Sequence, residues 1–288
     1  MKRVSMQHVH ALPGVSGGEI PGGCTLSVCH EEWGYAFCVR GDGGELLLLA
    51  GEAFEEGRDG TNGKDGRARE SVAGNPFLSR RDYKRVFVAA CYREKMLVPE
   101  RFYREEVLSL PWMLHGDCTG DDRLLCYRVK EWDARVVGAL PASVEQLYRE
   151  LQPECTFLPG GAPLARMAVR TCARDREYIF ADVRDDHVDL LLVRDRQPLL
   201  FNAFYHETES DIFYSMLHAA RSCQFNERHA RLVLTGRVAP GGKLHELLAR
   251  YWTSPLLVTE PALNALARDT TMNTTPFVHL LNLHACES

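Results

Sequence analysis

Two parts of the chain share one pattern of apolar and polar residues. In each part, three short runs follow one another, either alternating or continuously apolar, and tight polar links of two to four residues join them. Alternation with period two is typical of β-strands, and links this short join antiparallel neighbours. Each part therefore predicts a three-stranded antiparallel meander. The runs cover residues 24–30, 33–40 and 45–50 in the first part, and 177–183, 187–194 and 198–205 in the second.

Helical spacing and further strands follow each meander. Helices are predicted where apolar residues recur every three or four positions, and strands where short apolar runs stand between turn residues. Ser143 with Gln146, and Thr208 with Asp211, are predicted to cap two of the helices. In the first part we expect strands at 85–91, 124–129, 132–137 and 155–158, and helices at 141–151 and 164–169. In the second we expect helices at 209–223, 244–251 and 261–267, and strands at 231–234 and 256–258.

Three further stretches have less regular patterns. Leu97-Val98-Pro99 is predicted to start a helix, because proline suits the first helical turn, and Pro111 to kink or end it. Residues 1–23 and 51–76 are rich in glycine and lack a sustained period. The first of these predicts an irregular arm, and the second a flexible insertion. The apolar residues 277–283 fit no single element.

Three antiparallel strands followed by alternating helices and strands is the order of a ribonuclease-H-like unit, and here it occurs twice. We therefore predict an α/β protein with two such subdomains in tandem, at residues 24–172 and 176–288. Two units of this kind make the actin-like ATPase fold. The two halves share this order of elements and almost no sequence identity, so the repeat is one of pattern.

Composition narrows the class of protein. The 288 residues carry a net charge of −5, with 45% hydrophobic and 25% charged residues, as in ordinary globular proteins. A basic character that would suit nucleic acid is absent, and no apolar run is long enough for a membrane span. We therefore expect a cytoplasmic protein without nucleic-acid partners. The 10 cysteines form no Cys-x-x-Cys pair, so they are predicted to be reduced core residues and not zinc ligands.

Several short stretches together resemble a known family. The chain is similar to an uncharacterised family of bacterial proteins, found mainly in Bacteroidetes, that has an actin-like ATPase fold and no established function. The resemblance implies the fold and implies no reaction. The matching stretches are Leu97-Val98-Pro99 with Phe102-Tyr103, the run Phe201 to Tyr205 followed by Asp211 to Tyr214, Leu234-Thr235-Gly236, and Cys286-Glu287.

The phosphate-binding turn of the second half departs from the pattern that this fold implies. Actin-like ATPases typically read Asp-x-Gly-Gly-Gly-Thr there, with the aspartate serving magnesium and the glycines letting backbone amides approach the phosphates. Asp182 stands at the aspartate position, but Arg184, Asp185 and Asp186 replace the glycines. Two of these side chains carry the same charge sign as a triphosphate.

The other two nucleotide-binding elements are also degraded. The turn of the first half contains Glu31, Glu32 and Gly34, and the strand end that would face adenosine keeps one glycine, Gly236, before Arg237. We therefore predict a non-catalytic pseudo-ATPase that serves as a protein-binding or scaffold module, without a bound cofactor or metal. The alternative is a divergent ATPase or phosphotransferase that holds ATP and magnesium between the subdomains.

Weaker candidates for a site have simpler explanations. The aspartates at 182, 185, 186 and 189 could hold magnesium or calcium, but their spacing does not match a calcium loop, so a solvated turn is favoured. His206 lies near Glu207 and Asp211 without a matching nucleophile and is taken as a strand-end residue. The tryptophans at 33, 112, 132 and 252 are expected to be core or interface anchors.

Overall fold

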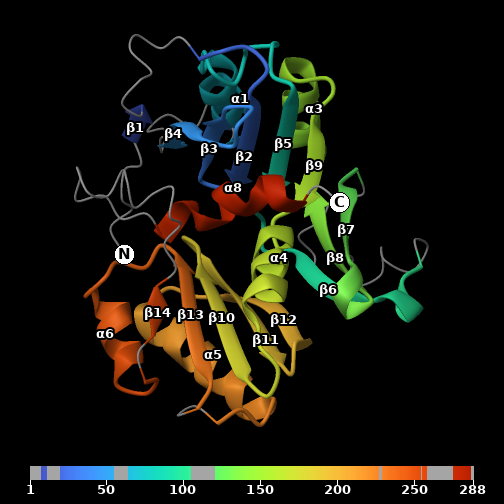
Figure 1. Ribbon diagram of the computed structural model, residues 1–288. Helices are drawn as coiled ribbons and strands as arrows, with labels where there is room; N and C mark the ends of the chain where they lie inside the picture. Colours follow the sequence, from blue (N-terminus) through green and yellow to red (C-terminus); the bar gives the residue numbers. More distant parts are fainter. Residues whose placement is uncertain are drawn as a thin grey trace.

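The computed structural model describes residues 8–11, 20–54, 64–104, 121–226, 229–253, 255–257 and 275–286. Its upper sheet in Figure 1 has the strand order β1-β4-β3-β2-β5-β9. β2, β3 and β4 form the predicted antiparallel meander, and β5 and β9 extend the sheet in parallel. The strands are β1 (His8–Ala11), β2 (Thr25–Glu31), β3 (Gly34–Arg40), β4 (Leu46–Ala53), β5 (Arg85–Ala90) and β9 (Thr156–Pro159).

The lower sheet repeats this plan. Its order is β12-β11-β10-β13-β14, with the first three strands antiparallel and the last two added in parallel. Without β1, the two sheets have the same order of strands, so the predicted repeat of pattern is also a repeat of topology. The strands are β10 (Glu177–Val183), β11 (His187–Arg194), β12 (Gln197–Tyr205), β13 (Arg231–Gly236) and β14 (Leu256–Leu257).

A small third sheet stands beside the other two, with the antiparallel order β6-β8-β7 (Figure 1). The predicted strand pair is confirmed as β7 (Arg123–Val129) and β8 (Ala134–Leu140). The helix predicted to start at Leu97 is wrong there, because this stretch belongs to β6 (Lys95–Pro99). Val98 packs in one apolar cluster and Leu97 against another, which is the two-sided burial of a strand. Pro111 lies outside the described residues.

Four predicted helices are present: α3 (Ala142–Leu151), α4 (Ala162–Thr171), α5 (Glu209–Ser222) and α6 (Lys243–Ala249). At the start of α5, the side chains of Thr208 and Asp211 cap each other's backbone amides, as predicted. The capping box predicted for α3 is wrong, because Pro141 occupies the cap position and the Gln146 side chain donates to Glu150 instead. The helix predicted at 261–267 falls outside the described part of the chain.

Regular structure also forms where none was expected. Residues 8–11 add β1 to the edge of the upper sheet, within the segment predicted as an irregular arm. The expectation of a flexible insertion is wrong for Lys64–Gly74, which form helix α1. α1 has no apolar stripe, and tertiary contacts stabilise it instead. Val72 is fully buried, Ser71 donates to Glu52, and Arg69 pairs with Glu150 of α3.

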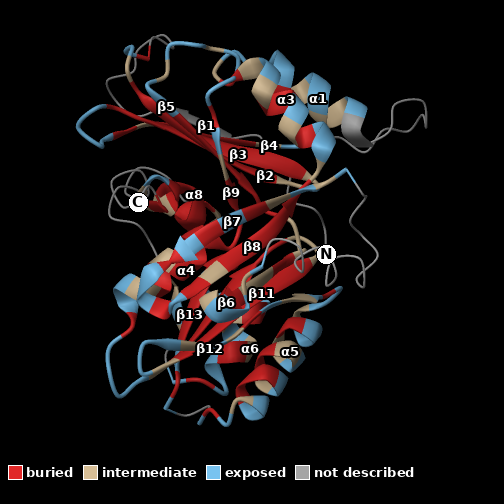
Figure 2. Cartoon of the chain, turned by 90° about the vertical axis from the view of Figure 1, so that its right-hand side faces the viewer, coloured by how far each residue is buried: buried red, intermediate tan, exposed pale blue. Residues whose placement is uncertain are grey.

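The C-terminal segment lies between the two large sheets. α8 (Val278–Asn282), flanked by 3-10 turns, crosses the middle of the molecule in Figure 1 and contacts α4, β2, β3 and β13. One apolar cluster therefore joins both sheets through α4 and α8, while α1 and α3 cover the outer face of the upper sheet and α5 and α6 that of the lower one. Figure 2 shows this layering, with buried sheets and α8 inside and exposed residues on the outer helices.

The described cysteines fit the prediction of reduced residues. All nine that the structure describes are free thiols, and seven of them are buried. Trp132 and Trp252 are buried as expected of anchors, whereas Trp33 is half-buried. Among the described helices, none is both long and apolar enough to cross a membrane.

Candidate functional site

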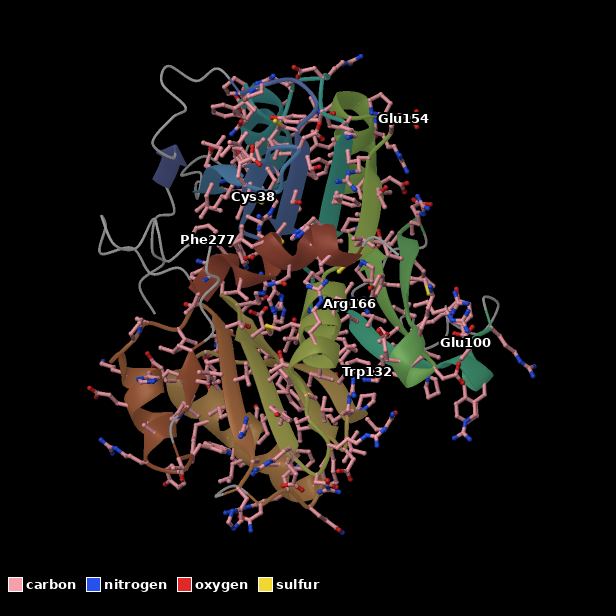
Figure 3. All side chains as sticks on the ribbon, viewed as in Figure 1. Cys38, Glu100, Trp132, Glu154, Arg166 and Phe277 are labelled. Carbon is pink, nitrogen blue, oxygen red and sulfur yellow. The ribbon has the colours of Figure 1, made fainter. Side chains whose placement is uncertain are left out.

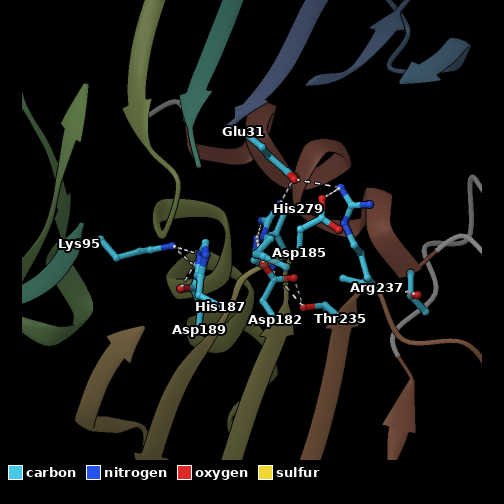
Figure 4. A network of polar contacts seen from close by, with 12 residues as sticks. Glu31, Lys95, Asp182, Asp185, His187, Asp189, Thr235, Arg237 and His279 are labelled. Atoms are coloured by element: carbon cyan, nitrogen blue, oxygen red, sulfur yellow. Dashed lines mark hydrogen bonds and ion pairs between the residues drawn. The ribbon is translucent and has the colours of Figure 1, made fainter. Parts of the chain in front are cut away.

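Two hairpin turns face each other across the space between the large sheets. The β2–β3 turn belongs to the upper sheet and the β10–β11 turn to the lower one. In each meander the first strand ends at the interface between the sheets, so the turn that follows it lies there (Figure 4). These are the turns that the sequence placed around a phosphate. Charged side chains join them directly, and His279 of α8 and Lys95 of β6 complete the network from two other elements.

Arg184 lies at the centre of this network. Its Nη1 donates to Glu31 Oε1 at 2.6 Å, and its Nε lies 2.5 Å from Asp182 Oδ2. Its Nη2 donates to His279 Nδ1 at 3.1 Å. The side chain is 6% exposed, so these interactions operate with little screening by water. The pKa of Arg184 is raised, since the two carboxylates outweigh the effect of burial.

Glu31 connects the two sheets through a second arginine. Its other oxygen, Oε2, accepts from Arg237 Nη2 at 3.3 Å, and the same nitrogen lies 2.7 Å from Asp185 Oδ2. Burial alone would raise the pKa of Glu31, but Arg184 and Arg237 together lower it. A carboxylate of the upper sheet thus holds two guanidinium groups of the lower sheet at the position expected for phosphate.

Asp182 occupies the position expected for a magnesium site, but both of its carboxylate oxygens contact protein groups. Thr235 Oγ1 donates to Asp182 Oδ1 at 2.8 Å. Because arginine can only donate, His279 Nδ1 accepts from Arg184, and His279 Nε2–H therefore points toward Thr235 Oγ1 at 3.4 Å. Burial would raise the pKa of Asp182, but Arg184 and the other partners lower it to about 2.

A second buried group ties the third sheet to the lower sheet. Lys95 Nζ of β6 donates to Asp189 Oδ2 of β11 at 2.6 Å, and both side chains are at most 2% exposed. Lys95 also contacts His187 Nε2 at 3.3 Å, while His187 Nδ1 donates to Asp186 Oδ1 at 2.7 Å. The expectation of a solvated acidic turn is therefore wrong for Asp182 and Asp189, which are buried and paired with cations.

The two remaining glycines serve the packing of the sheets. A Cβ on Gly34 would meet Glu52 O of the neighbouring strand at 2.5 Å, and one on Gly236 would meet Val183 O at 2.2 Å. Gly236 also has φ +80°, which disfavours other residues. The amides of Arg184 and Arg237 donate to His187 O and Val183 O, so the turns direct these two N–H groups into the protein.

The structure brings the predicted residues of both halves together, apart from Glu32, which is exposed beside the network. Sequence reasoning missed Lys95, Thr235 and His279. Lys95 opens an apolar strand, and a lone lysine there carries no sign of its distant partner. His279 belongs to the segment whose pattern fitted no element. In the described part of the chain, no group of three His, Cys, Asp or Glu side chains is arranged to hold a metal ion.

Two buried histidines predict a loss of stability in mild acid. Burial lowers the pKa of both His30 and His279 to about 4, whereas in the unfolded chain both protonate near 6.5. Between these values the unfolded state binds more protons, so the free energy of unfolding falls as pH drops from 7 toward 4. We expect a loss of a few kcal/mol, measured by urea unfolding at pH 7.5 and pH 5, where carboxylates of the unfolded chain are still ionised.

A variant comparison isolates the histidine effect. His30→Gln removes the group that titrates and keeps a side chain able to bond the Tyr148 hydroxyl, which lies 3.0 Å from His30 Nδ1. The difference in stability between pH 7.5 and pH 5 should shrink in this variant. His229→Gln changes an exposed side chain and should leave the difference as it is. An unchanged pH dependence in the His30 variant would contradict this explanation.

Two solved structures share the fold along almost their whole length. A Bacteroides thetaiotaomicron protein with an actin-like ATPase fold and unknown function matches with a TM-score of 0.70 and 20% identity, over 87% of this chain and 99% of that one. The PilM–PilN type IV pilus biogenesis complex matches with a TM-score of 0.56 and 13% identity, over 92% and 98%. At these identities the likeness shows the fold alone, and it confirms the predicted actin-like architecture.

Sequence comparison gives the family. No curated protein matches the chain. A family model, described as a protein of unknown function (DUF3822), matches residues 19–254, which include both turns and the residues that join them. The chain therefore belongs to this family of unknown function, whose fold is the actin-like ATPase fold.

Proposed function

We propose that this protein is a non-catalytic member of the actin-like fold that serves as a protein-binding or scaffold module. The observation that carries the proposal is the contact of Glu31 with Arg184 and Arg237 across the two phosphate turns. In an actin-like ATPase the nucleotide lies between these turns. Here side chains of the protein join them.

Electrostatics and backbone geometry both support the absence of nucleotide chemistry. A triphosphate at this position would have to displace Glu31 and Asp182 from Arg184, and it would face the carboxylates of Asp185 and Asp186. Separating buried ion pairs costs several kcal/mol, because each charge is left without its partner. The turn also lacks the glycines through which backbone amides approach phosphate oxygens.

Binding of a protein partner fits the fold and one structural neighbour. PilM was solved together with PilN, so at least one protein of this architecture occurs in a complex with another protein. The likeness is one of fold, and the fold alone does not determine a partner. The joined turns support a role in which the two halves form one stable surface.

Nucleotide titration tests the proposal. We expect calorimetry with ATP or ADP and magnesium, at millimolar concentrations, to give no heat of binding, and the melting temperature to stay constant. A ligand that binds the native state would raise the melting temperature by mass action. The pairing of Arg184 with Glu31 and Asp182 gives the physical reason for the expected result.

The opposite outcome would establish the divergent ATPase. Magnesium-dependent ATP binding, with turnover lost in Asp182→Ala and in the milder Asp182→Asn, would overturn the proposal. Both variants need a check of folding by circular dichroism, since Asp182 is buried. The matched control is Asp42→Asn, which removes an exposed carboxylate of the surface pair with Lys84.

A further inference from the structure

A pocket opens beside the joined turns. It has a volume of about 410 Å³, within the range of ligand-binding cavities. Its walls come from the β2–β3 turn, the segment after β5, the end of β8 and the β10–β11 turn, so all three sheets contribute. The pocket is therefore formed only when the halves and the third sheet are assembled.

The lining of this pocket is acidic. Two guanidinium groups, those of Arg93 and Arg184, oppose the carboxylates. Arg93 lies 3.4 Å from Glu94, and Arg184 pairs with Asp182 behind the wall. Also behind the wall, Lys95 pairs with Asp189, and Arg237 pairs with the lining residue Asp185. The two carboxylates and two cations behind the wall, those of Asp182, Asp189, Lys95 and Arg237, are equal in number, so the excess of carboxylates in the lining remains. Carboxylates in a concave site concentrate negative potential, which repels phosphate and attracts cations. The six lining carboxylates are those of Glu31, Glu32, Glu94, Asp122, Asp185 and Asp186.

Aromatic and apolar groups complete the pocket. Trp33 and Tyr92 line it, together with Pro141. The Tyr92 ring lies 6.2 Å from the His30 ring, which also contacts the rings of Phe54 and Tyr148. Aromatic faces attract ammonium and guanidinium groups, and they also pack against the apolar stem of a lysine or arginine side chain.

A second hollow of about 370 Å³ adjoins the first. Glu32, Tyr92 and Pro141 line both, so the two hollows share a wall. The second one is mainly apolar, with Phe54, Val144 and Leu147 among its lining residues, and it lies between α1 and α3. Side by side, the hollows present an acidic compartment next to an apolar one.

We propose that the acidic pocket receives a lysine or arginine side chain from a protein partner, with a neighbouring apolar residue of that partner in the second hollow. The proposal rests on the function proposed above and names the chemistry of the partner. Charge complementarity selects the basic group. The adjoining apolar hollow favours a peptide over a free amine, since a small polyamine has no apolar side chain to place there.

Fluorescence polarisation with short peptides tests this inference on the 288-residue chain. The probe is a fluorescein-labelled peptide with a central arginine between leucines, and its counterpart carries the uncharged isostere citrulline. We expect the arginine peptide to bind at least about tenfold more tightly, and its affinity to fall with rising salt. The variant Glu32→Gln/Asp122→Asn, which removes two lining carboxylates, should weaken binding by about tenfold or more.

A matched control changes the net charge by the same amount at positions away from the pocket. Glu154→Gln/Glu246→Gln removes two exposed carboxylates, of which Glu154 lies at the upper end of the molecule in Figure 3, away from the turns. This control should bind like the unmodified chain. Equal affinity for the arginine and citrulline peptides would overturn the inference. So would unchanged binding by the pocket variant, or displacement of the probe by spermidine at the same concentration as by unlabelled peptide.

The two proposals fail in different ways. Absence of both ATP and peptide binding would overturn the inference about the basic partner and leave the non-catalytic function standing. Binding and turnover of ATP would overturn the proposed function, whatever the peptides do. Equal melting temperatures for the variants and the unmodified chain show that any loss of peptide binding is local.

Discussion

Replacing Lys95 by methionine should lower the free energy of unfolding by about 3–5 kcal/mol. The variant leaves the Asp189 carboxylate, 1% exposed, without the ammonium group 2.6 Å away. A buried charge without a partner has lost its hydration, and no ion pair compensates for that loss. Urea unfolding followed by circular dichroism measures the effect as a shift of the midpoint.

Two companion variants make this result specific. Lys84→Met removes an exposed lysine from its surface pair with Asp42 and should cost at most about 1 kcal/mol. Lys95→Met/Asp189→Leu removes both buried charges, and it should recover much of the stability lost in the single variant. A cost below about 1 kcal/mol for Lys95→Met would mean that Asp189 reaches water or another cation.

Replacing Arg184 by methionine should cost a similar or larger amount, again about 3–5 kcal/mol. Two carboxylates depend on this guanidinium group, Glu31 from one sheet and Asp182 from the other. Without it, Asp182, which is 1% exposed, would lose its guanidinium partner, and Glu31, which is 16% exposed, would keep Arg237. We expect the upper and lower sheets to lose their charged connection and the unfolding midpoint to fall.

The pH dependence distinguishes electrostatic loss from simple loss of packing. In the unmodified protein the pKa of Asp182 is lowered to about 2, so its contribution is present above pH 4 and is lost as pH falls toward 2. In Arg184→Met the largest part of that contribution is missing at all pH values. The stability difference between the two proteins should therefore shrink in acid. A difference that stays constant from pH 7 to pH 3 would point to packing alone. Arg123→Met, at an exposed ion pair with Glu145, is the control.

The meanders and most helices could be predicted because their signals are local. Alternating residues defined the strands on either side of the turns, and Thr208 with Asp211 marked the start of α5 within four positions. α1 was missed because residues 66–74, whose burial the structure describes, include one fully buried residue, Val72, and the helix is held by contacts with distant groups. Leu97 was assigned to a helix because proline is compatible with both a helix start and the end of a strand.

The sequence predicted most of the residues at the site, but it did not predict how their charges pair. The loss of glycines placed Arg184, Asp185 and Asp186 at the turn, but nothing local showed that Arg184 would lie against Glu31, 153 positions earlier. Pairing of buried charges depends on which surfaces meet in the folded protein. The contributions of Lys95 and His279 depend on the third sheet and on α8. The sequence pattern predicted two of the three strands of that sheet, and it did not predict α8.

The position of α8 has a consequence for folding during synthesis. Residues 275–286 are synthesised after the lower sheet, yet they cover residues of β2 and β3, which leave the ribosome long before it. Until this segment arrives, the inner face of the upper sheet, including Cys29 and Cys38, has an incomplete cover. Chains of this size pass through states with exposed apolar surface. The nascent upper sheet therefore offers chaperones a binding surface for as long as the lower sheet is still being made.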